Sequence, residues 1–282
     1  MGCCLYRALS DLHRGDVDLR RESTVRALVT GAGARLGQAM AVYLAERGYD
    51  VAVHYASSRV GALETVEAIV KAGRRGVTLQ ADLLDETQTQ ALLPQASEAL
   101  GGPITCLINN ASIFEQDSLQ DATRESWDRH IESNLRAPFV LSQAMVAQGL
   151  TAASDEAGEP VAAGLIVNML DQRVRKLTPE FASYTIAKMG LWALTQTAAQ
   201  SAAPHVRVNA IGPGPTLQGS RQSEADFAAQ RASTVLQRGA DASDICAALG
   251  YLLDAKAVTG QLICVDGGQH LAWQTPDVFA SE

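Results

Sequence analysis

Tyr184 and Lys188 are the pair of residues in this sequence whose types and spacing are best suited to chemistry. They stand four positions apart in the segment SYTIAK, so a helix starting at Ser183 would place both side chains on one face, one turn apart. A free tyrosine titrates near pH ~10, and lowering this to ~7 takes about 4 kcal/mol, which a close and sheltered ammonium group could supply. The spacing therefore predicts a phenol that exchanges a proton.

Chance, with an ordinary aromatic and a solvated cation, is the alternative for this pair. Six tyrosines and four lysines in 282 residues give about 0.09 expected pairs at this spacing, so context has to decide. Asp171 directly follows the apolar run GLIVNML, a predicted strand, and open α/β sheets bind ligands at the carboxyl ends of their strands. Asn134 lies within residues 125–150, a predicted helix, where an asparagine either has a specific role or faces solvent.

A glycine-rich loop, TGAGARLG, lies between a predicted strand at residues 25–31 and a predicted helix that ends at Gly48. Gly31, Gly33 and Gly37 allow the backbone to turn tightly and approach a ligand, and the free amides at the helix start can bind a phosphate. Strand, glycine loop and helix in this order predict a dinucleotide-binding site.

The second predicted strand, residues 51–55, ends in hydrogen-bond donors where an NAD enzyme usually has an acid for the adenosine ribose. Arg35 of the glycine loop adds a guanidinium to this group. The donors at and after the end of this strand are His54, Tyr55, Ser57, Ser58 and Arg59. They suit a 2′-phosphate and favour NADPH over NADH, the alternative being that the arginines are ordinary surface cations.

Strands and helices alternate along the rest of the chain. Further strands are predicted at residues 77–82, 104–108, 164–170, 206–215 and 261–268, and further helices at 61–72, 86–100, 183–203 and 242–254. The alternation predicts the α/β class: a single-domain Rossmann fold over residues 24–282, with a doubly wound seven-stranded parallel sheet and helices on both faces. Residues 151–164 are expected to form a polar loop, and residues 217–238 a loop and short helix that could close over a site.

Composition narrows the classes of partner. A net charge of −8 without a cluster of basic residues argues against nucleic acid and favours a small-molecule substrate. Five cysteines without metal-ligand spacing indicate reduced thiols, no metal and a cytoplasmic location. No apolar run reaches the ~20 residues of a membrane span, and the N-terminus lacks the apolar core of a signal peptide. Residues 1–23 show no periodicity, so we expect a flexible extension.

Several short motifs resemble the short-chain dehydrogenase/reductase family when they are taken together and in order. They are TGAGARLG, Asp82, NNAS, Asn134, YTIAK and IGPGPT, and they span most of residues 26–268. The resemblance implies that Tyr184 donates a proton, that Lys188 binds the nicotinamide ribose and lowers the tyrosine pKa, and that Asn134 holds a water extending the proton relay.

The same resemblance implies a bound NADP. Asp82 would meet the adenine, Asn109 would line the cofactor, and Thr216 would touch the nicotinamide amide. The expected contacts in full are Gly31, Arg35, Leu36, Gly37, His54, Tyr55, Ser57, Ser58, Asp82, Leu83, Asn109, Ala111, Ser112, Lys188, Gly214 and Thr216.

Two positions depart from the common pattern of that family. Arg35 replaces the middle loop glycine, and Asp171 replaces the usual catalytic serine, whose neutral hydroxyl a carboxylate cannot imitate unless protonated. Both departures, with HYASS, NNASIF and NMLD, resemble the pteridine reductase branch, which includes dihydromonapterin reductases. There the aromatic residue equivalent to Phe114 sandwiches a pterin against nicotinamide; alternatively, Phe114 is a core residue.

We therefore expect an NADPH-dependent oxidoreductase that reduces a pterin-like C=N bond, with Asp171, Tyr184, Lys188 and Asn134 catalytic and Phe114, Asp171 and Tyr184 at the substrate. A carbonyl or 3-oxoacyl reductase is the alternative within the family. A non-catalytic dinucleotide-binding sensor is the alternative outside it, against which the intact tyrosine, lysine and asparagine argue. A homotetramer is expected from the resemblance and from the alanine-rich helices at 125–150 and 183–203.

Overall fold

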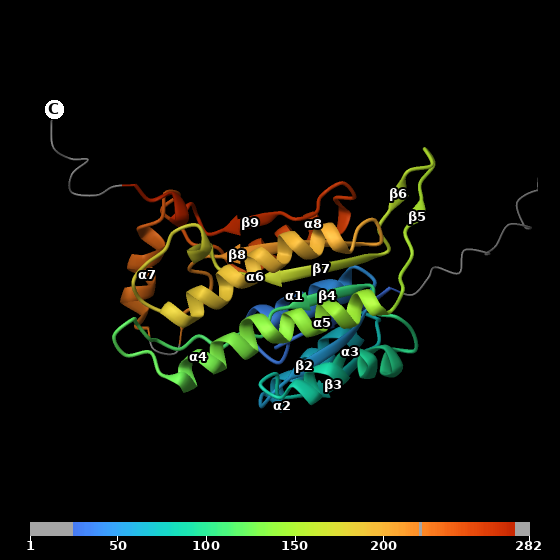
Figure 1. Ribbon diagram of the computed structural model, residues 1–282, viewed down its shortest axis with the longest axis horizontal. Coiled ribbons are helices and arrows are strands. Elements are labelled where there is room, and N and C mark those ends of the chain that lie inside the picture. The colour runs from blue at the N-terminus through green and yellow to red at the C-terminus, as the bar shows by residue number, and fades with distance from the viewer. Residues whose placement is uncertain (1–24, 220–221, 274–282) are drawn as a thin grey trace, which may run out of the picture.

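Seven parallel strands form the central sheet of the protein in this computed structural model, which describes residues 25–219 and 222–273 (Figure 1). The strands are β1 (Arg26–Val29), β2 (Asp50–Tyr55), β3 (Gly76–Gln80), β4 (Cys106–Asn109), β7 (Gly164–Met169), β8 (Val206–Pro213) and β9 (Leu262–Val265). Their order is β3-β2-β1-β4-β7-β8-β9, with every neighbouring pair parallel. The strand order reverses between β1 and β4, the place where doubly wound sheets bind ligands.

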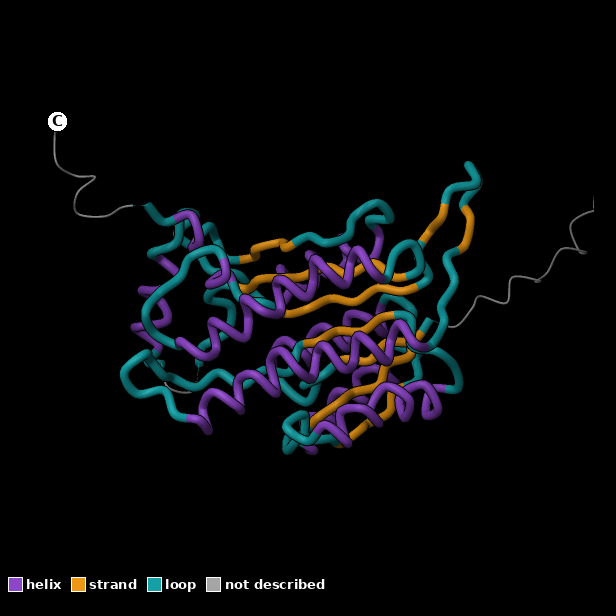
Figure 2. Tube along the Cα trace, viewed as in Figure 1, coloured by secondary structure: helices purple, strands orange, loops and turns teal. Residues whose placement is uncertain are grey.

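Helices cover both faces of this sheet (Figure 2). One face carries α1 (Arg35–Glu46), α2 (Arg59–Lys71) and α8 (Ala242–Asp254), and the other carries α3 (Glu86–Leu100), α5 (Ala137–Ala147) and α6 (Ala182–Ser201). The sequence-based prediction of a single-domain Rossmann fold with seven parallel strands is confirmed. The predicted N-terminal extension, residues 1–23, lies outside the described residues.

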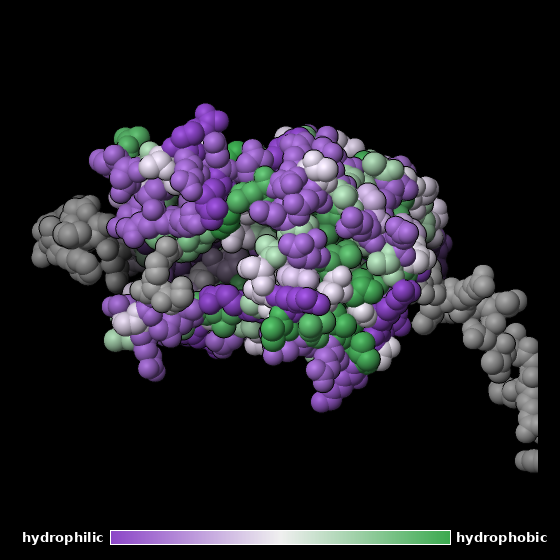
Figure 3. All heavy atoms as spheres, turned by 90° about the horizontal axis from the view of Figure 1, so that it is seen from below, coloured by the Kyte–Doolittle hydropathy of each residue, from purple (hydrophilic) through white to green (hydrophobic). Residues whose placement is uncertain are grey.

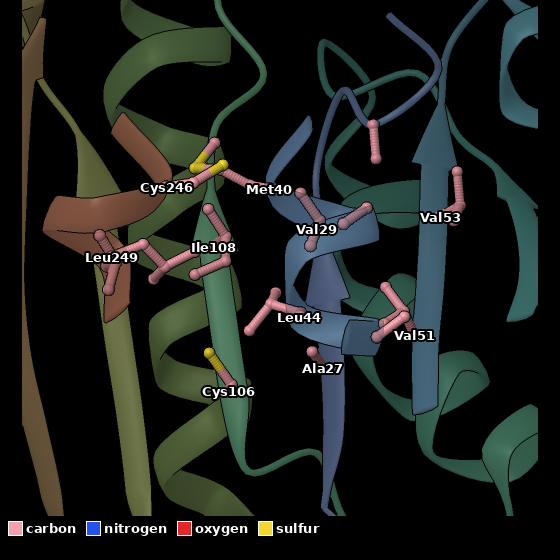
Figure 4. Packing of buried hydrophobic residues seen from close by; sticks show 14 of the residues in the cluster. Ala27, Val29, Met40, Leu44, Val51, Val53, Cys106, Ile108, Cys246 and Leu249 are labelled. Carbon is pink, nitrogen blue, oxygen red and sulfur yellow. The ribbon is translucent and has the colours of Figure 1, made fainter. Parts of the chain in front are cut away.

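The core is built by the alternation of side chains along the strands. Val29 of β1 packs in the cluster that contains Met40 of α1 and Leu249 of α8 (Figure 4). Its neighbour Leu28 packs in the cluster on the opposite face, which contains Leu92 of α3. Because both faces are buried, the strands are continuous apolar runs rather than alternating ones.

The predicted helix at residues 125–150 is interrupted. The structure has α4 (Arg124–Ile131), a π-helical turn (Glu132–Arg136) and α5 (Ala137–Ala147) in direct succession. Thr123 caps the first turn of α4 with its side chain. Single π-helical turns within helices frequently mark functional sites, and Asn134 lies inside this one.

Two other segments differ from or extend the predictions. The predicted polar loop at 151–164 contains a small antiparallel hairpin, β5 (Ala153–Ser154) with β6 (Pro160–Val161). The region after β8 contains the short helix α7 (Glu224–Ala232), as expected for residues 217–238. Among the described residues, no helix has both the length and the apolar composition to cross a bilayer.

Candidate active site

A cavity of about 700 Å³ opens at the carboxyl ends of β1, β2 and β4, and Figure 3 shows a hollow at this end of the molecule. Most of the cofactor contacts predicted from the sequence line it. These are Gly31, Arg35, Leu36, Gly37, His54, Tyr55, Ser57, Ser58, Asp82, Leu83, Ala111 and Ser112. The fold therefore brings together residues from four separate loops, as the strand-end argument predicted.

The glycine loop can take its path because two of its residues lack a side chain. Gly31 has φ +64°, a left-handed conformation that favours glycine, and a Cβ there would lie 3.0 Å from the backbone of Ala111. A Cβ at Gly37 would clash with the carbonyl oxygen of Gly31. The loop is thus pressed against the segment after β4 and leaves the start of α1 open to the cavity.

His54 stabilises the glycine loop through a hydrogen bond to its backbone. Its Nδ1 accepts a hydrogen bond of 3.0 Å from the Gly31 amide, so Nε2 carries the proton and donates to the carbonyl of Ala81 at 3.1 Å. Burial lowers the pKa of His54 to about 4. The imidazole is therefore neutral at pH 7, and both of its nitrogens are engaged by the protein itself.

Arg35 lies at the mouth of the cavity. It has φ +54°, and its guanidinium donates to the carbonyls of Leu217 (3.0 Å) and Gln218 (2.9 Å) in the loop after β8. The side chain therefore connects the glycine loop to the loop after β8. Arg35 and Arg129 are the cations among the described residues that line the cavity.

The neighbouring asparagines have different roles from those predicted. Asn109 is buried, and its amide donates to Asn168 at 2.8 Å. Asn110, which the sequence analysis did not select, lines the cavity and donates to the carbonyl of Thr30 at 2.8 Å. The NN pair itself was visible in the sequence, but only the direction of each side chain at the end of β4 separates the two roles.

Tyr184 and Lys188 lie in α6 and meet Asp171, which follows β7. The Tyr184 hydroxyl donates to Asp171 Oδ2 at 3.1 Å, and the Lys188 ammonium donates to the Met169 carbonyl at 2.7 Å. The Lys188 nitrogen is 5.6 Å from the centroid of the Tyr184 ring. The predicted acid and its cationic neighbour, both buried, therefore share one site with the partly buried carboxylate of Asp171.

Charge and burial set the protonation of this group. Burial, and next the Asp171 carboxylate, raise the pKa of Tyr184 well above its ordinary value. Burial also lowers the pKa of Lys188 to about 8, against the opposing charge of Asp171. The expectation that Lys188 would lower the tyrosine pKa is wrong for this structure, because the strongest charge acting on the phenol is a carboxylate. Tyr184 is a protonated acid at neutral pH.

Asn134 holds the segment that follows β4. In the π-helical turn its amide donates to the Ile113 carbonyl at 2.8 Å and accepts from the Ile113 amide at 2.9 Å. The role shown is therefore to position the chain next to Ser112, which lines the cavity. The role of Asn134 in a water relay stays a prediction.

Phe114 is a surface-exposed aromatic residue at the site and not a core residue. It is 45% exposed, stacks on Phe181 with ring centroids 4.3 Å apart, and meets the Tyr184 ring edge-on at 4.7 Å. Phe181, which the sequence analysis missed, has φ +58° immediately before α6, and the Arg173 guanidinium lies over its ring. Only the fold brings these two phenylalanines together, because 66 residues of chain lie between Phe114 and Phe181.

Gly214 and Thr216 lie outside the residues that line the cavity. The Thr216 hydroxyl is buried and donates to the Gly214 carbonyl at 3.1 Å, and a Cβ at Gly214 would crowd Asp266. Their predicted contact with the nicotinamide amide stays a prediction. No group of three or more metal-binding side chains occurs among the described residues.

Comparison with known proteins decides the family. The family model described as enoyl-(acyl carrier protein) reductase matches residues 31–270. A short-chain dehydrogenase/reductase from Armillaria gallica is 33% identical over 86% of this chain and 94% of its own length. The chain belongs to the short-chain dehydrogenase/reductase family.

Two relatives of this short-chain reductase carry more specific names. The 3-oxoacyl-[acyl-carrier-protein] reductase FabG of Staphylococcus aureus is 32% identical over 88% of this chain and 99% of its own length. The crystal structure of FolM alternative dihydrofolate reductase 1 from Brucella suis, in complex with NADP, is 41% identical, with a TM-score of 0.82 over 90% of this chain and 98% of that one. The predicted family is confirmed, and a protein described as an alternative dihydrofolate reductase is among the similar structures.

Proposed function

We propose that this short-chain reductase uses NADPH to reduce a C=N bond in a pterin-like ring, such as a dihydropterin or dihydrofolate. The observation that carries the proposal is the 3.1 Å hydrogen bond from the Tyr184 hydroxyl to Asp171, beside the exposed ring of Phe114. The site thus combines a protonated acid, a carboxylate and an aromatic surface.

The cavity fits a dinucleotide. Its volume of about 700 Å³ lies within the usual range for small-molecule sites, and the glycine loop leaves the first amides of α1 facing it. Tyr55, Ser57 and Ser58 supply donors at the end of β2, and Arg35 supplies a cation. Since no carboxylate stands at the end of β2, a 2′-phosphate is tolerated there and NADPH is favoured over NADH.

The chemistry required of the protein is the delivery of one proton. Bound NADPH supplies the hydride to the ring carbon. Tyr184 and Asp171 hold a proton between the phenol oxygen and Oδ2, and the raised pKa keeps the phenol protonated until a more basic ring nitrogen accepts it. Lys188 is buried and bonded to the Met169 carbonyl, and its proposed role is to bind a ribose hydroxyl of the cofactor.

Asp171 suits a ring nitrogen better than a ketone. A ketone reductase requires a neutral donor to the carbonyl oxygen, and a carboxylate in that place would repel the developing oxyanion. A pterin C=N bond takes its proton on nitrogen, so that donor is not needed. Phe114 meanwhile offers a stacking surface to a flat ring.

The similarity to FolM of Brucella suis supports the pterin-like substrate, whereas the similarity to FabG of Staphylococcus aureus favours a second candidate, reduction of 3-oxoacyl thioesters. The experiment is a comparison of kcat/KM for NADPH oxidation with dihydropterins or dihydrofolate, small ketones and 3-oxoacyl thioesters. We expect the first class to be reduced most efficiently by the wild type.

Two variants sharpen that comparison. Asp171→Ser should lower the efficiency with dihydropterins and raise the efficiency with ketones, because serine restores a neutral donor to a carbonyl oxygen. Tyr184→Phe should lower kcat with every substrate by about 10²-fold or more, the usual value of a general acid. Preference of the wild type for ketones or thioesters would overturn the pterin assignment and leave the second candidate.

A further inference from the structure

A buried polar network lies behind the active site and joins three segments that are distant in the sequence. Its members are Asp117, after β4; His130, in α4; and Ser183, in the first turn of α6. All three are at least 95% buried. None of them was selected from the sequence, and none lines the cofactor cavity.

Helix α6, which carries the catalytic tyrosine, is capped by this network rather than by its own N-cap. Phe181 at the N-cap position makes no side-chain hydrogen bond to the first turn. Instead the Ala182 amide donates to the Asp117 carbonyl at 3.2 Å, and the Ser183 amide donates to Asp117 Oδ1 at 3.2 Å. Asp117, although distant in the sequence, therefore supplies the hydrogen-bond acceptors that the first amides of a helix require.

The second oxygen of Asp117 is also fully used. Asp117 Oδ2 accepts from the hydroxyls of Ser183 and Ser126, the latter at 3.1 Å. Burial raises the pKa of Asp117, but these hydrogen bonds outweigh it and keep the pKa below its ordinary value, so the carboxylate is charged. A negative charge at a helix N-terminus is in turn favourable.

His130 is the third member of the network, and its hydrogen bonds determine which ring nitrogen carries the proton. Its Nε2 accepts from the Glu115 amide at 3.1 Å, so its Nδ1 carries the proton and donates to the Ser183 hydroxyl at 2.6 Å. The chain of donors runs from His130 to Ser183 to Asp117. The His130 ring also meets the Tyr184 ring edge-on at 6.0 Å.

The segment held by this network carries Phe114. Ile113 is bonded to Asn134, Glu115 to His130, and Asp117 to the start of α6. Phe114 thus lies between anchored residues, with its ring against Tyr184. Through Asp117, the aromatic surface and the acid are fixed to one another by hydrogen bonds that do not involve the cavity.

We propose that Asp117 is a positioning residue for the reaction, which caps α6 from the segment carrying Phe114 and so holds the Tyr184 hydroxyl at the correct place beside the substrate. Loss of this cap loosens the first turn of α6, where Tyr184 lies, more than the second turn, where Lys188 lies. The rate of proton transfer then falls more than the affinity for the cofactor. The activity part of this proposal rests on the proposed function.

The test compares Asp117→Ala with Asp85→Ala. Asp85 caps α3 with its carboxylate, accepting from the amides of Thr87 and Gln88, so its loss removes a cap of the same chemistry from a helix without catalytic residues. Hydrogen exchange of the amides in the first turn of α6 should accelerate about tenfold or more in Asp117→Ala and remain at the wild-type rate in Asp85→Ala. This readout needs no substrate, so it remains valid if the pterin assignment fails.

Activity provides the second readout. Asp117→Ala should lower kcat roughly tenfold or more, because small displacements of a reacting group are costly, while the Kd for NADPH stays within about twofold. Asp117→Asn, which keeps an acceptor for the Ser183 amide, should recover kcat to within about threefold of wild type. If Asp117→Ala does not fold, Asp117→Glu, which displaces the carboxylate by one methylene, takes its place with the same expectations. Wild-type exchange in α6, or a wild-type kcat, would overturn the proposal.

Discussion

We propose that the choice between NADPH and NADH depends on Arg35. It is the cation of the glycine loop, and its guanidinium bonds the carbonyls of Leu217 and Gln218, which are neutral, so a phosphate would be a stronger partner. Loss of a charge-assisted contact costs about 1.5 to 3 kcal/mol, so Arg35→Ala should raise the Kd for NADPH roughly tenfold or more and leave that for NADH little changed. Equal losses of affinity for NADPH and NADH, measured by fluorescence titration, would show that Arg35 does not bind the 2′-phosphate.

The pKa of Lys188 predicts how cofactor binding depends on pH. Because its pKa is lowered to about 8, the ammonium is present below pH 8 and is lost as the pH rises above it. We expect the Kd for NADPH to increase above pH 8, by about tenfold in total if one charged hydrogen bond is lost.

Lys188→Arg should remove this dependence, since an arginine stays protonated throughout the range. The exposed Lys256 provides a control, and Lys256→Arg should keep the wild-type profile. A wild-type Kd that is constant from pH 7 to 9.5 would argue that the charge of Lys188 does not contribute to binding.

At the scale of elements, β2 stabilises the glycine loop through His54. The folded pKa of about 4 lies below the ordinary 6.5, so the unfolded chain binds a proton first as the pH falls. The contribution of His54 to stability is therefore present above pH 6.5 and lost between pH 6.5 and 4. The loss should reach roughly 3 kcal/mol, since each pKa unit corresponds to about 1.4 kcal/mol.

His54→Gln should reduce the slope of the unfolding free energy against pH. The reduction should correspond to about one proton fewer taken up on unfolding, because glutamine can form hydrogen bonds but does not titrate. His205→Gln is the matched control, as His205 is exposed and bonds the Ala152 amide. Denaturant unfolding between pH 4 and 7 measures both. Identical slopes for wild type and His54→Gln would contradict the assignment of a neutral buried imidazole.

At the scale of the whole molecule, we propose that four chains associate. Apolar side chains remain exposed along α4, α5 and α6, including Trp127, Phe139, Val146, Ile186 and Met189. Apolar side chains grouped on neighbouring helices are typical of subunit interfaces. Light scattering should give a mass four times the 29.9 kDa of the chain.

Phe139→Asp should dissociate this assembly, because it places a charge at the proposed contact. Leu63→Asp provides the control, since Leu63 is also an exposed apolar residue but lies on α2, on the other face of the sheet. A monomeric wild type, or an equal effect of the two variants, would refute the tetramer or its proposed surface.

The sequence by itself determined the order of elements and the candidate residues of the site. Short apolar runs bounded by glycines are typical of buried parallel strands, and glycine, tyrosine and lysine at fixed spacing are local patterns, so Gly31, Tyr184 and Lys188 could be found without a fold. Asp171 was found in the same way, from its place at the end of a strand.

Only the tertiary structure decided which groups share a site and how they titrate. The pKa of Tyr184 rises because the fold buries it against Asp171, and this burial has no signature in the spacing of YTIAK. The stacking of Phe114 on Phe181 and the capping of α6 by Asp117 join segments more than sixty residues apart. Contacts of this kind depend on the relative placement of whole elements, which local residue patterns do not specify.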